Sequence, residues 1–380
     1  KANQSQQQLV CLDDFERWAL ATLPRKTLDY YRSGANCERT LRDNVDAFQD
    51  WLLMPRMLGS VANRSLATTL LGQPVVAPIG VAPTAMQRLA SDRGELDTAE
   101  AAAEAGVCLT VSTIATCSLE SIAQANGPSG LRWFQLYVYK DRELTKRMVS
   151  RVEQAGYKAL VLTVDTPIFG QRYADARNGF GLPGHLKMAN FEAEGGKEAE
   201  GMGGSDGLSG GVSALTRYSS QLFDPNLSWA DVKWLTEISK LPVIVKGIVR
   251  PEDAQLALDS GASAIWVSNH GARQLDTVPA SINTLPAIVS AVSGRAEIYL
   301  DGGIRTGTDV LKALALGARA VFLGRPVLWG LSHSGRSGVR RVLDIAIKEL
   351  DLAMALSGET CARTVRPELV VHRRRMKSKL

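Results

Sequence analysis

Short apolar runs alternate with longer amphipathic stretches along the chain from residue 75 onward. The runs are rich in β-branched residues, as buried strands are, and the stretches between them repeat their apolar residues at helical spacing. This alternation predicts βα units around a parallel sheet. Eight strands are expected, at 75–83, 107–113, 133–138, 159–165, 242–247, 264–270, 297–303 and 320–325.

Helices are expected between these strands and after the last one, at 95–105, 118–125, 142–154, 230–239, 252–260, 282–292, 309–316 and 339–356. Several of them stop at a glycine, as helices do when the next residue adopts a left-handed conformation. Eight strands are the number that closes a barrel, so we predict a (β/α)8 TIM barrel. A doubly wound open sheet is the alternative.

The rest of the chain is expected to attach to this barrel within a single domain that spans residues 1–380. Residues 1–74 form an N-terminal extension that should cap the bottom or side of the barrel at 75–358 and can bring Tyr30 to the site. Residues 166–227 are an insertion after the fourth strand, and 359–380 are a tail. Glycines crowd the insertion, so it should be mobile. A lid that covers the substrate and plain disorder are both open readings. The glycines are Gly195, Gly196, Gly201, Gly203, Gly204, Gly207, Gly210 and Gly211.

Composition narrows the function classes. Apolar residues make up 45% and charged residues 22%, which is ordinary for a soluble protein with a large core. The net charge is only +5, and the basic residues gather at the C-terminus, so we expect no nucleic-acid partner. No apolar run is long enough for a membrane span. The five cysteines are scattered without a CxxC pair, which argues against a disulfide framework or a metal site and for a reducing intracellular compartment.

Polar residues stand at the C-terminal end of every expected strand. In a barrel of this kind these ends meet at one rim, and the active site lies there. One polar strand end is explained by contact with water, but eight converging ends favour a functional site. The residues are Thr84, Ser112, Gln135, Tyr137, Thr163, Asp165, Lys246, Ser268, His270, Asp301, Arg305, Gly324 and Arg325.

The last two strands end in "LDGGIRTGTDV" and "FLGRP". Loops in these two places often bind phosphate, because glycines let backbone N–H groups approach the anion and a helix N-terminus adds positive charge. Arg305 and Arg325 could supply bidentate bonds to the same anion. The alternative is that the glycines serve tight turns and the arginines are solvated. The pattern predicts a cofactor or substrate that carries phosphate.

His270 could act as a general base if a carboxylate fixes its orientation, and Asp165 is the natural partner at the adjacent rim position. Arg172 and Arg273 could hold a carboxylate, with hydroxyl donors from Tyr30 and Tyr137. Lys246, at the end of a buried strand, needs a negative partner. These parts suit proton abstraction next to a carboxylate, with an electron acceptor alongside.

The motifs "SNHGARQLD", "APTAMQ", "QLYVYKDRE", "TVDTP", "VKGI", "LDGGIRTGTDVLKALALGARAVFLGRP" and "AMALSG" resemble the FMN-dependent L-2-hydroxy acid oxidase family, which includes glycolate oxidases and long-chain hydroxy acid oxidases. The likeness runs from about residue 9 to the C-terminus. It implies that His270 takes a proton from the substrate and that Asp165 stabilises the charged form of His270. Arg273 and Tyr30 would bind the substrate carboxylate, and Tyr137 would contact the 2-hydroxyl group.

The same resemblance implies how FMN is held. Arg172 would add positive charge above the flavin, and Lys246 near N1 and O2 would favour the anionic reduced form. The other expected FMN contacts are Thr84 and Ala85 at the ring, Ser112, Gln135 and Thr163 at its polar edge, Asp301 at the ribityl chain, Gly303, Arg305, Gly324 and Arg325 at the phosphate, and Ser268 as a further cofactor-binding residue.

Two positions depart from the family pattern. Ile114 stands where glycolate-handling members typically have Trp, and Phe169 stands where a smaller aliphatic residue is usual. The smaller Ile114 should make room for a longer aliphatic chain, while Phe169 could restrict the pocket or grip an apolar tail. We therefore expect medium to long-chain 2-hydroxy acids rather than glycolate. A neutral packing swap at Ile114 is the alternative.

The chain ends in Ser378-Lys379-Leu380, which matches a peroxisomal address read by an import receptor. This agrees with an oxidase that reduces oxygen to hydrogen peroxide; a basic nuclear signal or a solvated tail is the alternative. The resemblance also implies a homotetramer. Two further readings stay open: a dehydrogenase that passes electrons to an acceptor other than oxygen, and a barrel that binds flavin without catalysis.

Overall fold

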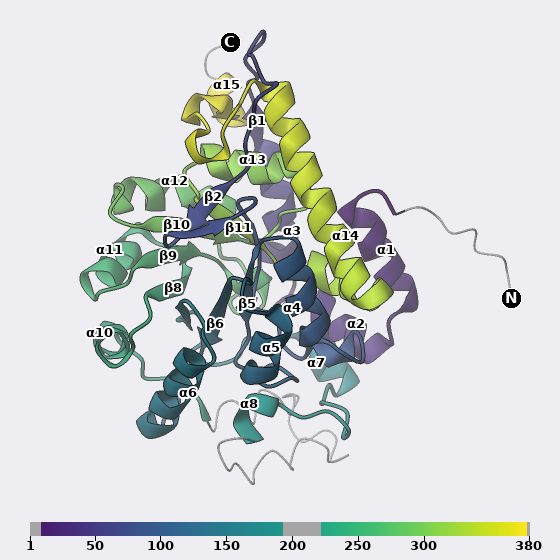
Figure 1. Ribbon diagram of the computed structural model, residues 1–380, viewed down its shortest axis with the longest axis vertical. Coiled ribbons are helices and arrows are strands. Elements are labelled where there is room, and N and C mark those ends of the chain that lie inside the picture. Colours follow the sequence, from purple (N-terminus) through teal and green to yellow (C-terminus); the bar gives the residue numbers. More distant parts are fainter. Residues whose placement is uncertain (1–8, 193–221, 378–380) are drawn as a thin grey trace, which may run out of the picture.

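The computed structural model describes residues 9–192 and 222–377, and a closed barrel of eight parallel strands lies at its centre (Figure 1). The barrel confirms the predicted (β/α)8 fold, and the doubly wound open sheet is wrong because β11 pairs with β4. The strands follow one another around the barrel in chain order. They are β4 (Ile79–Val81), β5 (Cys108–Val111), β6 (Arg132–Leu136), β7 (Leu160–Thr163), β8 (Val243–Ile248), β9 (Ala264–Val267), β10 (Glu297–Asp301) and β11 (Ala320–Leu323).

Most strands are shorter than predicted, because the polar residues at their C-terminal ends leave the ladder and turn over the rim. The strand predicted at 75–83 is split: residue 75 ends β3 (Gln73–Val75), which pairs antiparallel with β2 (Thr68–Leu70), and β4 begins at Ile79. Likewise, β9 ends at Val267, and His270 begins a short 3-10 turn, η4 (His270–Ala272).

The interior of the barrel is filled with aromatic side chains rather than open. Trp133, Trp266, Tyr299 and Phe322 are almost fully buried in one cluster, and the rings of Trp266 and Phe322 lie 4.1 Å apart. Gly80 makes room for Phe322, since a Cβ atom at Gly80 would lie 2.4 Å from the ring. The β2–β3 hairpin adds Leu70 and Val75 to this cluster. The packed core leaves the rim formed by the C-terminal strand ends as the place for a site.

A helix follows each barrel strand. The helices are α4 (Glu95–Glu104), α5 (Leu119–Asn126), α6 (Arg142–Gln154), α10 (Trp229–Ile238), α11 (Pro251–Asp259), α12 (Ser281–Val292), α13 (Gly307–Ala315) and α14 (Arg325–Ser357). The prediction of a last helix at 339–356 was too short. Helix α14 begins directly after β11 and is interrupted at Ser334 and Gly335, which have non-helical backbone angles. The residues Ser and Gly around this kink resemble a loop in the sequence, which hid the first half of the helix.

The N-terminal extension reaches both ends of the barrel. Its helices are α1 (Leu12–Thr22), α2 (Arg25–Arg32) and α3 (Arg39–Asp46), followed by η1 (Ala47–Asp50) and β1 (Trp51–Leu53). Helix α1 packs on α14, α3 packs on η4, and β1 pairs with β12 (Val370–His372), which precedes α15 (Arg373–Lys377). The β2–β3 hairpin packs on the barrel core, whereas α2 and α3 bring side chains to the rim at the other end.

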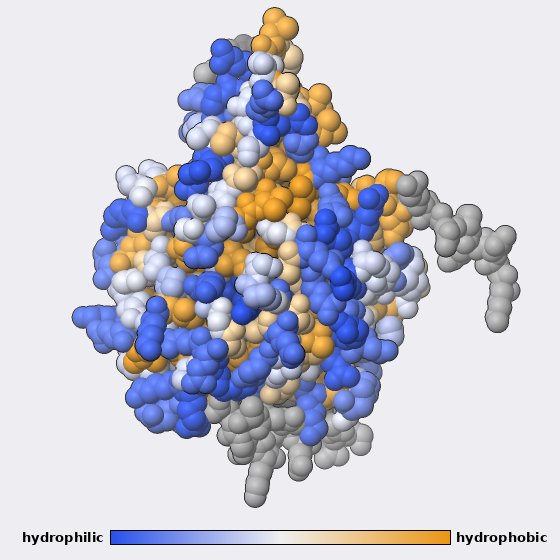
Figure 2. Space-filling model, in the orientation of Figure 1, coloured by the Kyte–Doolittle hydropathy of each residue, from blue (hydrophilic) through white to orange (hydrophobic). Residues whose placement is uncertain are grey.

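The described part of the insertion contains α7 (Tyr173–Asn178) and α8 (Ala189–Glu192). The glycine cluster at 195–211 and the terminal residues 378–380 lie outside the described residues. Figure 2 shows apolar surface on the projecting tip beside β1 and the end of α14. Exposed apolar side chains of these segments are Met54, Met57, Leu58, Leu352 and Leu356. Among the described helices, none has the length and apolar character needed to cross a membrane.

Candidate active site

A cavity with about 1150 Å³ of empty space, part of it open to solvent, lies at the C-terminal ends of the barrel strands. The structure brings almost all of the predicted site residues to its wall. They are Tyr30, Thr84, Ala85, Ser112, Ile114, Gln135, Tyr137, Thr163, Phe169, Arg172, Lys246, His270, Arg273, Asp301, Gly303, Arg305, Gly324 and Arg325. The other two, Asp165 and Ser268, do not line the cavity but are hydrogen-bonded to residues that do.

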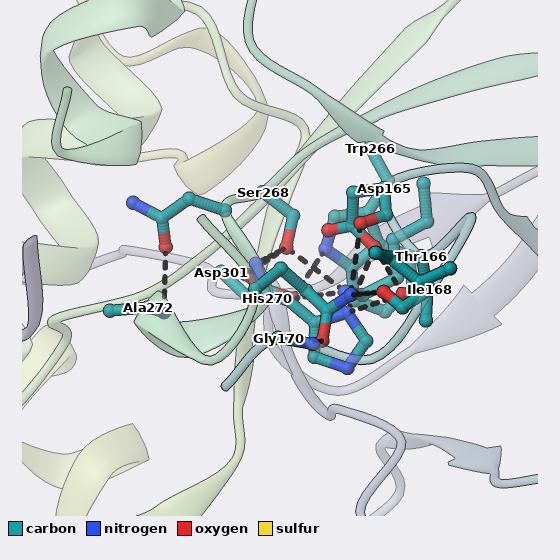
Figure 3. A network of polar contacts seen from close by, with 12 residues as sticks. Asp165, Thr166, Ile168, Gly170, Trp266, Ser268, His270, Ala272 and Asp301 are labelled. Carbon is teal, nitrogen blue, oxygen red and sulfur yellow. Dashed lines mark hydrogen bonds and ion pairs between the residues drawn. The ribbon is translucent and has the colours of Figure 1, made fainter. Parts of the chain in front are cut away.

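His270 and Asp165 form a close pair at this rim (Figure 3): Nδ1 of the imidazole lies 2.8 Å from Oδ1 of the carboxylate. The carboxylate selects the tautomer that carries its hydrogen on Nδ1, which leaves Nε2 free to accept a proton. Burial lowers the pKa of His270, and the charges of Lys246 and Arg172 add to this effect, while Asp165 opposes it. The imidazole is therefore neutral near neutral pH, the state that a general base needs.

Asp165 keeps its negative charge although it is buried. Burial raises the pKa of this carboxyl group, but His270, Lys246 and Thr166 lower it, and the net shift is downward. Its Oδ1 atom accepts from His270 and from the Thr166 hydroxyl, at 2.8 and 3.0 Å, whereas Oδ2 has no partner in the part of the chain that the structure describes. The carboxylate of Asp165 thus contacts the imidazole of His270 through a single oxygen atom.

The turn that carries His270 has an unusual backbone. His270 and Ala272 both have positive φ, 61° and 63°, which costs energy for residues with a side chain. Hydrogen bonds hold the turn: the Ser268 hydroxyl accepts from the His270 N–H, and the Asn269 side chain accepts from the Ala272 N–H. Asn269 in turn exchanges two amide hydrogen bonds with Asn44 on α3.

Lys246 finds its negative partner in Asp301, 3.3 Å away, on the other side of Ser268. The ammonium group donates to the Ser268 hydroxyl at 2.9 Å, and this hydroxyl donates to Asp301 at 2.6 Å. Trp266 donates to the second oxygen of Asp301 from inside the barrel, at 3.1 Å. Because Lys246 and Asp301 are both buried, this network compensates two charges that would otherwise be costly. The sequence did not indicate that these two residues are partners.

Two arginines make one side of the cavity positive. Arg273 donates to the backbone carbonyls of Tyr30 and Ser33, and its guanidinium lies 5.0 Å from the Tyr30 ring. Burial, together with the charge of Arg273, lowers the pKa of Arg172 to about 10, and the carboxylate of Asp175 is 3.5 Å from Arg172. Nε of Arg172 is buried and has no hydrogen-bond partner in the described ranges 9–192 and 222–377. An anionic ligand group is the natural complement of this pair.

The predicted phosphate corner contains one glycine, Gly303, at a close backbone contact. Gly303 has a φ of 82°, and a Cβ atom there would lie 1.8 Å from the carbonyl oxygen of Asn44. Helix α14 starts right after Gly324, so its N-terminus faces the cavity rim.

The arginines of this corner have protein partners of their own. Arg325 donates to the carbonyls of Tyr31, Ser33 and Gly271, and burial lowers its pKa to about 9. Arg305 donates to the carbonyl of Ile304. Some of the N–H groups that were expected to bind an anion therefore bind the N-terminal extension and the His270 turn instead.

Gln135 offers a donor that has no partner among the described residues. Its Oε1 atom accepts from the Thr113 N–H at 3.2 Å and from the Ser112 hydroxyl at 3.4 Å, which fixes the amide orientation. Its Nε2 atom is buried and makes no hydrogen bond. Across the cavity, the Thr84 hydroxyl accepts from Gln87 at 2.9 Å. A ring with carbonyl and nitrogen acceptors, such as a flavin, would satisfy the free Nε2 donor, so these residues fit FMN.

The outer wall of the cavity is aromatic. Tyr137 is buried, which raises the pKa of its hydroxyl group, and its ring lies 6.1 Å from that of Phe169 and 4.7 Å from that of Phe223. Tyr30 stacks on Phe180 with ring centroids 4.2 Å apart. Ile114 is buried against the cavity.

Gln274 fastens the segment after β7 to the His270 turn. Its Nε2 atom donates to the carbonyls of Asp165 and Ile168, at 3.1 and 3.0 Å, and its Oε1 atom accepts from the Gly170 N–H at 3.3 Å. The bridged segment includes Phe169, which lines the cavity.

Sequence reasoning missed several residues of the wall. The residues of the N-terminal extension do not follow a predicted barrel strand, and those after β10 and β11 are apolar residues or glycine. Neither group has the polar side chain at a strand end that identified the other site residues. They include Tyr31, Leu41, Asn44, Val45, Gly271, Gly302, Ile304, Pro326 and Leu328. In the described ranges, no group of His, Cys, Asp and Glu side chains is arranged to hold a metal ion.

Comparison with known proteins adds independent findings. A family model described as FMN-dependent dehydrogenase matches residues 19–372. The chain is 52% identical to 2-hydroxyacid oxidase 1 of Homo sapiens, over 92% of this chain and 93% of that protein. It is 49% identical to L-lactate oxidase of Nostoc sp., over 92% and 94% of the two chains. A crystal structure of mandelate oxidase with (S)-4-hydroxymandelic acid superposes with a TM-score of 0.89 at 41% identity, covering 96% of this chain and 98% of that one.

Proposed function

Because the chain belongs to the FMN-dependent dehydrogenase family and is an FMN-dependent 2-hydroxy acid oxidase, we propose that it oxidises medium to long-chain (S)-2-hydroxy acids to 2-oxo acids and passes the electrons to oxygen. The observation that carries this proposal is the His270–Asp165 pair beside Arg172 and Arg273 in the cavity that fits FMN. FMN is the cofactor of the family.

On the substrate side, we assign carboxylate binding to Arg273, Arg172 and Tyr30, and the 2-hydroxyl contact to Tyr137. Oxidation removes two electrons and two hydrogens from the substrate, and one of these hydrogens leaves as a proton to Nε2 of His270. The neutral state of the imidazole and the fixed hydrogen on Nδ1 support this role. Asp165 offsets the positive charge that the imidazole gains.

When bound, FMN supplies the two-electron acceptor. Lys246 would hold a positive charge beside the ring where negative charge develops, and Asp301 and Ser268 keep that ammonium in place. We assign the other contacts as follows: Thr84 and Ala85 to the ring face, Ser112, Gln135 and Thr163 to the polar edge, Asp301 also to the ribityl chain, and Gly303, Arg305, Gly324 and Arg325 to the phosphate.

The preference for longer chains rests on the outer wall of the cavity. Ile114 occupies less volume than the Trp expected in glycolate-handling relatives, and it is buried at the wall where a substrate tail would run. Phe169 and Tyr137 form an apolar surface that suits an aliphatic tail. A glycolate oxidase is the alternative, and one relative that is 49% identical is glycolate oxidase 3 of Oryza sativa subsp. japonica.

The test is anaerobic bleaching of the flavin absorbance by a series of (S)-2-hydroxy acids of increasing chain length, followed by admission of air. We expect bleaching to become faster from glycolate to longer acids and the colour to return rapidly in air, with one equivalent of hydrogen peroxide per turnover. Fastest bleaching by glycolate would refute the chain-length assignment. Slow return of colour in air with rapid reduction of a dye would favour a dehydrogenase, and a loaded protein that no acid bleaches would be a silent flavin-binding barrel.

We also propose a homotetramer that is imported into peroxisomes. The exposed apolar tip formed by Met54, Met57 and Leu58 supports self-association, because such patches are usually covered. The terminal Ser378-Lys379-Leu380 supports recognition by the import receptor. Light scattering of the purified protein tests the first proposal, and the location of a fluorescent fusion with and without the last three residues tests the second.

A further inference from the structure

A threonine hydroxyl lies inside the group of residues that performs the proton transfer. Thr166 follows Asp165 directly after β7, is buried, and points towards both Asp165 and His270 (Figure 3). Its Oγ1 atom donates to Oδ1 of Asp165 at 3.0 Å and lies 3.4 Å from Nδ1 of His270.

The hydrogens around Thr166 can be assigned from these contacts. Asp165 is ionised and can only accept, so the Thr166 hydroxyl hydrogen points to Oδ1. The lone pairs of Oγ1 then face the Nδ1–H of His270. One hydroxyl group thus contacts both members of the pair assigned to the proton transfer.

We propose that Thr166 is a positioning residue for the reaction: its hydroxyl fixes Oδ1 of Asp165 beside His270 and shares this oxygen, which stabilises the protonated imidazole. This inference rests on the proposed role of His270 as the base. Thr166 acts through its neighbours and makes no contact with the cavity.

The shared oxygen determines the sign of the effect. Both His270 and Thr166 bind Oδ1 of Asp165, so the threonine takes part of the negative charge that would otherwise favour the protonated imidazole. The charged groups that face His270 are Asp165 after β7, Lys246 on β8 and Arg172 before α7, with the Tyr137 phenol beside them. Removing the Thr166 hydroxyl leaves all of these charges in place. Oδ1 of Asp165 then binds His270 without a competing donor, so the carboxylate stabilises the protonated imidazole more strongly and the pKa of His270 rises.

The experiment compares pH profiles of flavin bleaching in the FMN-loaded enzyme. The isosteric variant Thr166→Val should raise the pH of the acid limb by about half a unit to one unit, because one hydrogen bond to a charged group is lost. It should also lower the rate at neutral pH about tenfold, because the Asp165 carboxylate loses a hydrogen bond that fixes its orientation towards His270. Thr166→Ser, which keeps the hydroxyl, should restore both quantities. Thr145→Val is the matched control, since this buried threonine accepts a bond from the Tyr139 N–H outside the cavity.

An acid limb of Thr166→Val that coincides with the parent, or a Thr166→Ser variant as impaired as Thr166→Val, overturns the proposal. An equal shift in Thr145→Val also overturns it, because the effect would then be a general loss of packing. If Thr166→Val does not bind FMN, Thr166→Ala is compared with Thr166→Ser by the same criteria. The variant His270→Gln distinguishes failure of the proposed function from failure of the Thr166 proposal. If His270→Gln bleaches at the parental rate, the proposed function itself is refuted. If His270→Gln is slow but the Thr166 variants behave like the parent, only the role of Thr166 is refuted.

Discussion

Replacing Asp165 by Asn tests the assigned base most directly, because the change removes one charge and keeps the shape of the side chain. The asparagine oxygen can still accept from Nδ1 of His270, so the tautomer is retained, but the protonated imidazole loses its counter-charge. A hydrogen bond to a charged group contributes about 1.5–3 kcal/mol, and each 1.4 kcal/mol corresponds to about tenfold in rate. We therefore expect the rate of flavin bleaching to fall about 10- to 150-fold.

The pH dependence gives this prediction a sign. Burial, Lys246 and Arg172 hold the pKa of His270 below its ordinary value, and Asp165 is the group that opposes them. The active form is the neutral imidazole, so activity is present above the pKa of His270 and is lost as the pH falls through it. In Asp165→Asn the pKa of His270 should fall further, and the acid limb should move to lower pH. This direction is opposite to the one expected for Thr166→Val.

The assay is stopped-flow anaerobic bleaching at saturating substrate between pH 5 and about 9. Asp259→Asn is the matched control, because this exposed carboxylate lies outside the cavity and forms a surface ion pair with Arg295 at 3.1 Å. A bleaching rate of Asp165→Asn within about threefold of the parent, or an acid limb that moves to higher pH, would refute the reasoning.

Three other changes probe the wall, the bridge and the phosphate corner. Ile114→Trp should shift the preference towards glycolate about tenfold by filling the space assigned to the substrate tail, measured as the ratio of kcat/KM values for long and short acids; an unchanged ratio would mean a neutral packing swap. Gln274→Met should lower kcat/KM about tenfold through loss of its three hydrogen bonds, and more for long acids, since Phe169 lies in the bridged segment; equal losses for all acids would contradict this. Gly303→Ala should weaken FMN binding at least tenfold in fluorescence titrations, because its Cβ would meet Asn44 at 1.8 Å; parental affinity would show that the loop yields without cost.

The site residues at the strand ends could be predicted because a closed parallel barrel brings the C-terminal ends of all its strands to one face. Once eight strands are recognised, their C-terminal ends must share a rim, so Gln135 and Lys246 are expected together although they are far apart in the chain. Periodicity also indicated most helices. Periodicity failed at α14, where Ser334 and Gly335 have non-helical backbone angles. The chain is helical before and after this kink, and α14 packs on α4 and α1.

Partnerships between side chains could not be predicted in this way. The pairing of Lys246 with Asp301 depends on which atoms face each other across Ser268, and strand-end positions alone leave several carboxylates equally plausible. The same holds for Arg325: its charge suggested a bond to an anion, but its guanidinium also meets three backbone carbonyls from two other segments.

The N-terminal extension contributes contacts to the site that the barrel alone does not provide. Asn44 exchanges hydrogen bonds with Asn269 beside the base, and its backbone carbonyl lies against Gly303 in the phosphate corner. A single residue of α3 therefore touches the two loops that must be placed relative to each other if substrate and cofactor are to meet. Because a strained turn such as the one at His270 persists only where its surroundings hold it, the extension is part of the catalytic architecture and not merely a cover over the barrel.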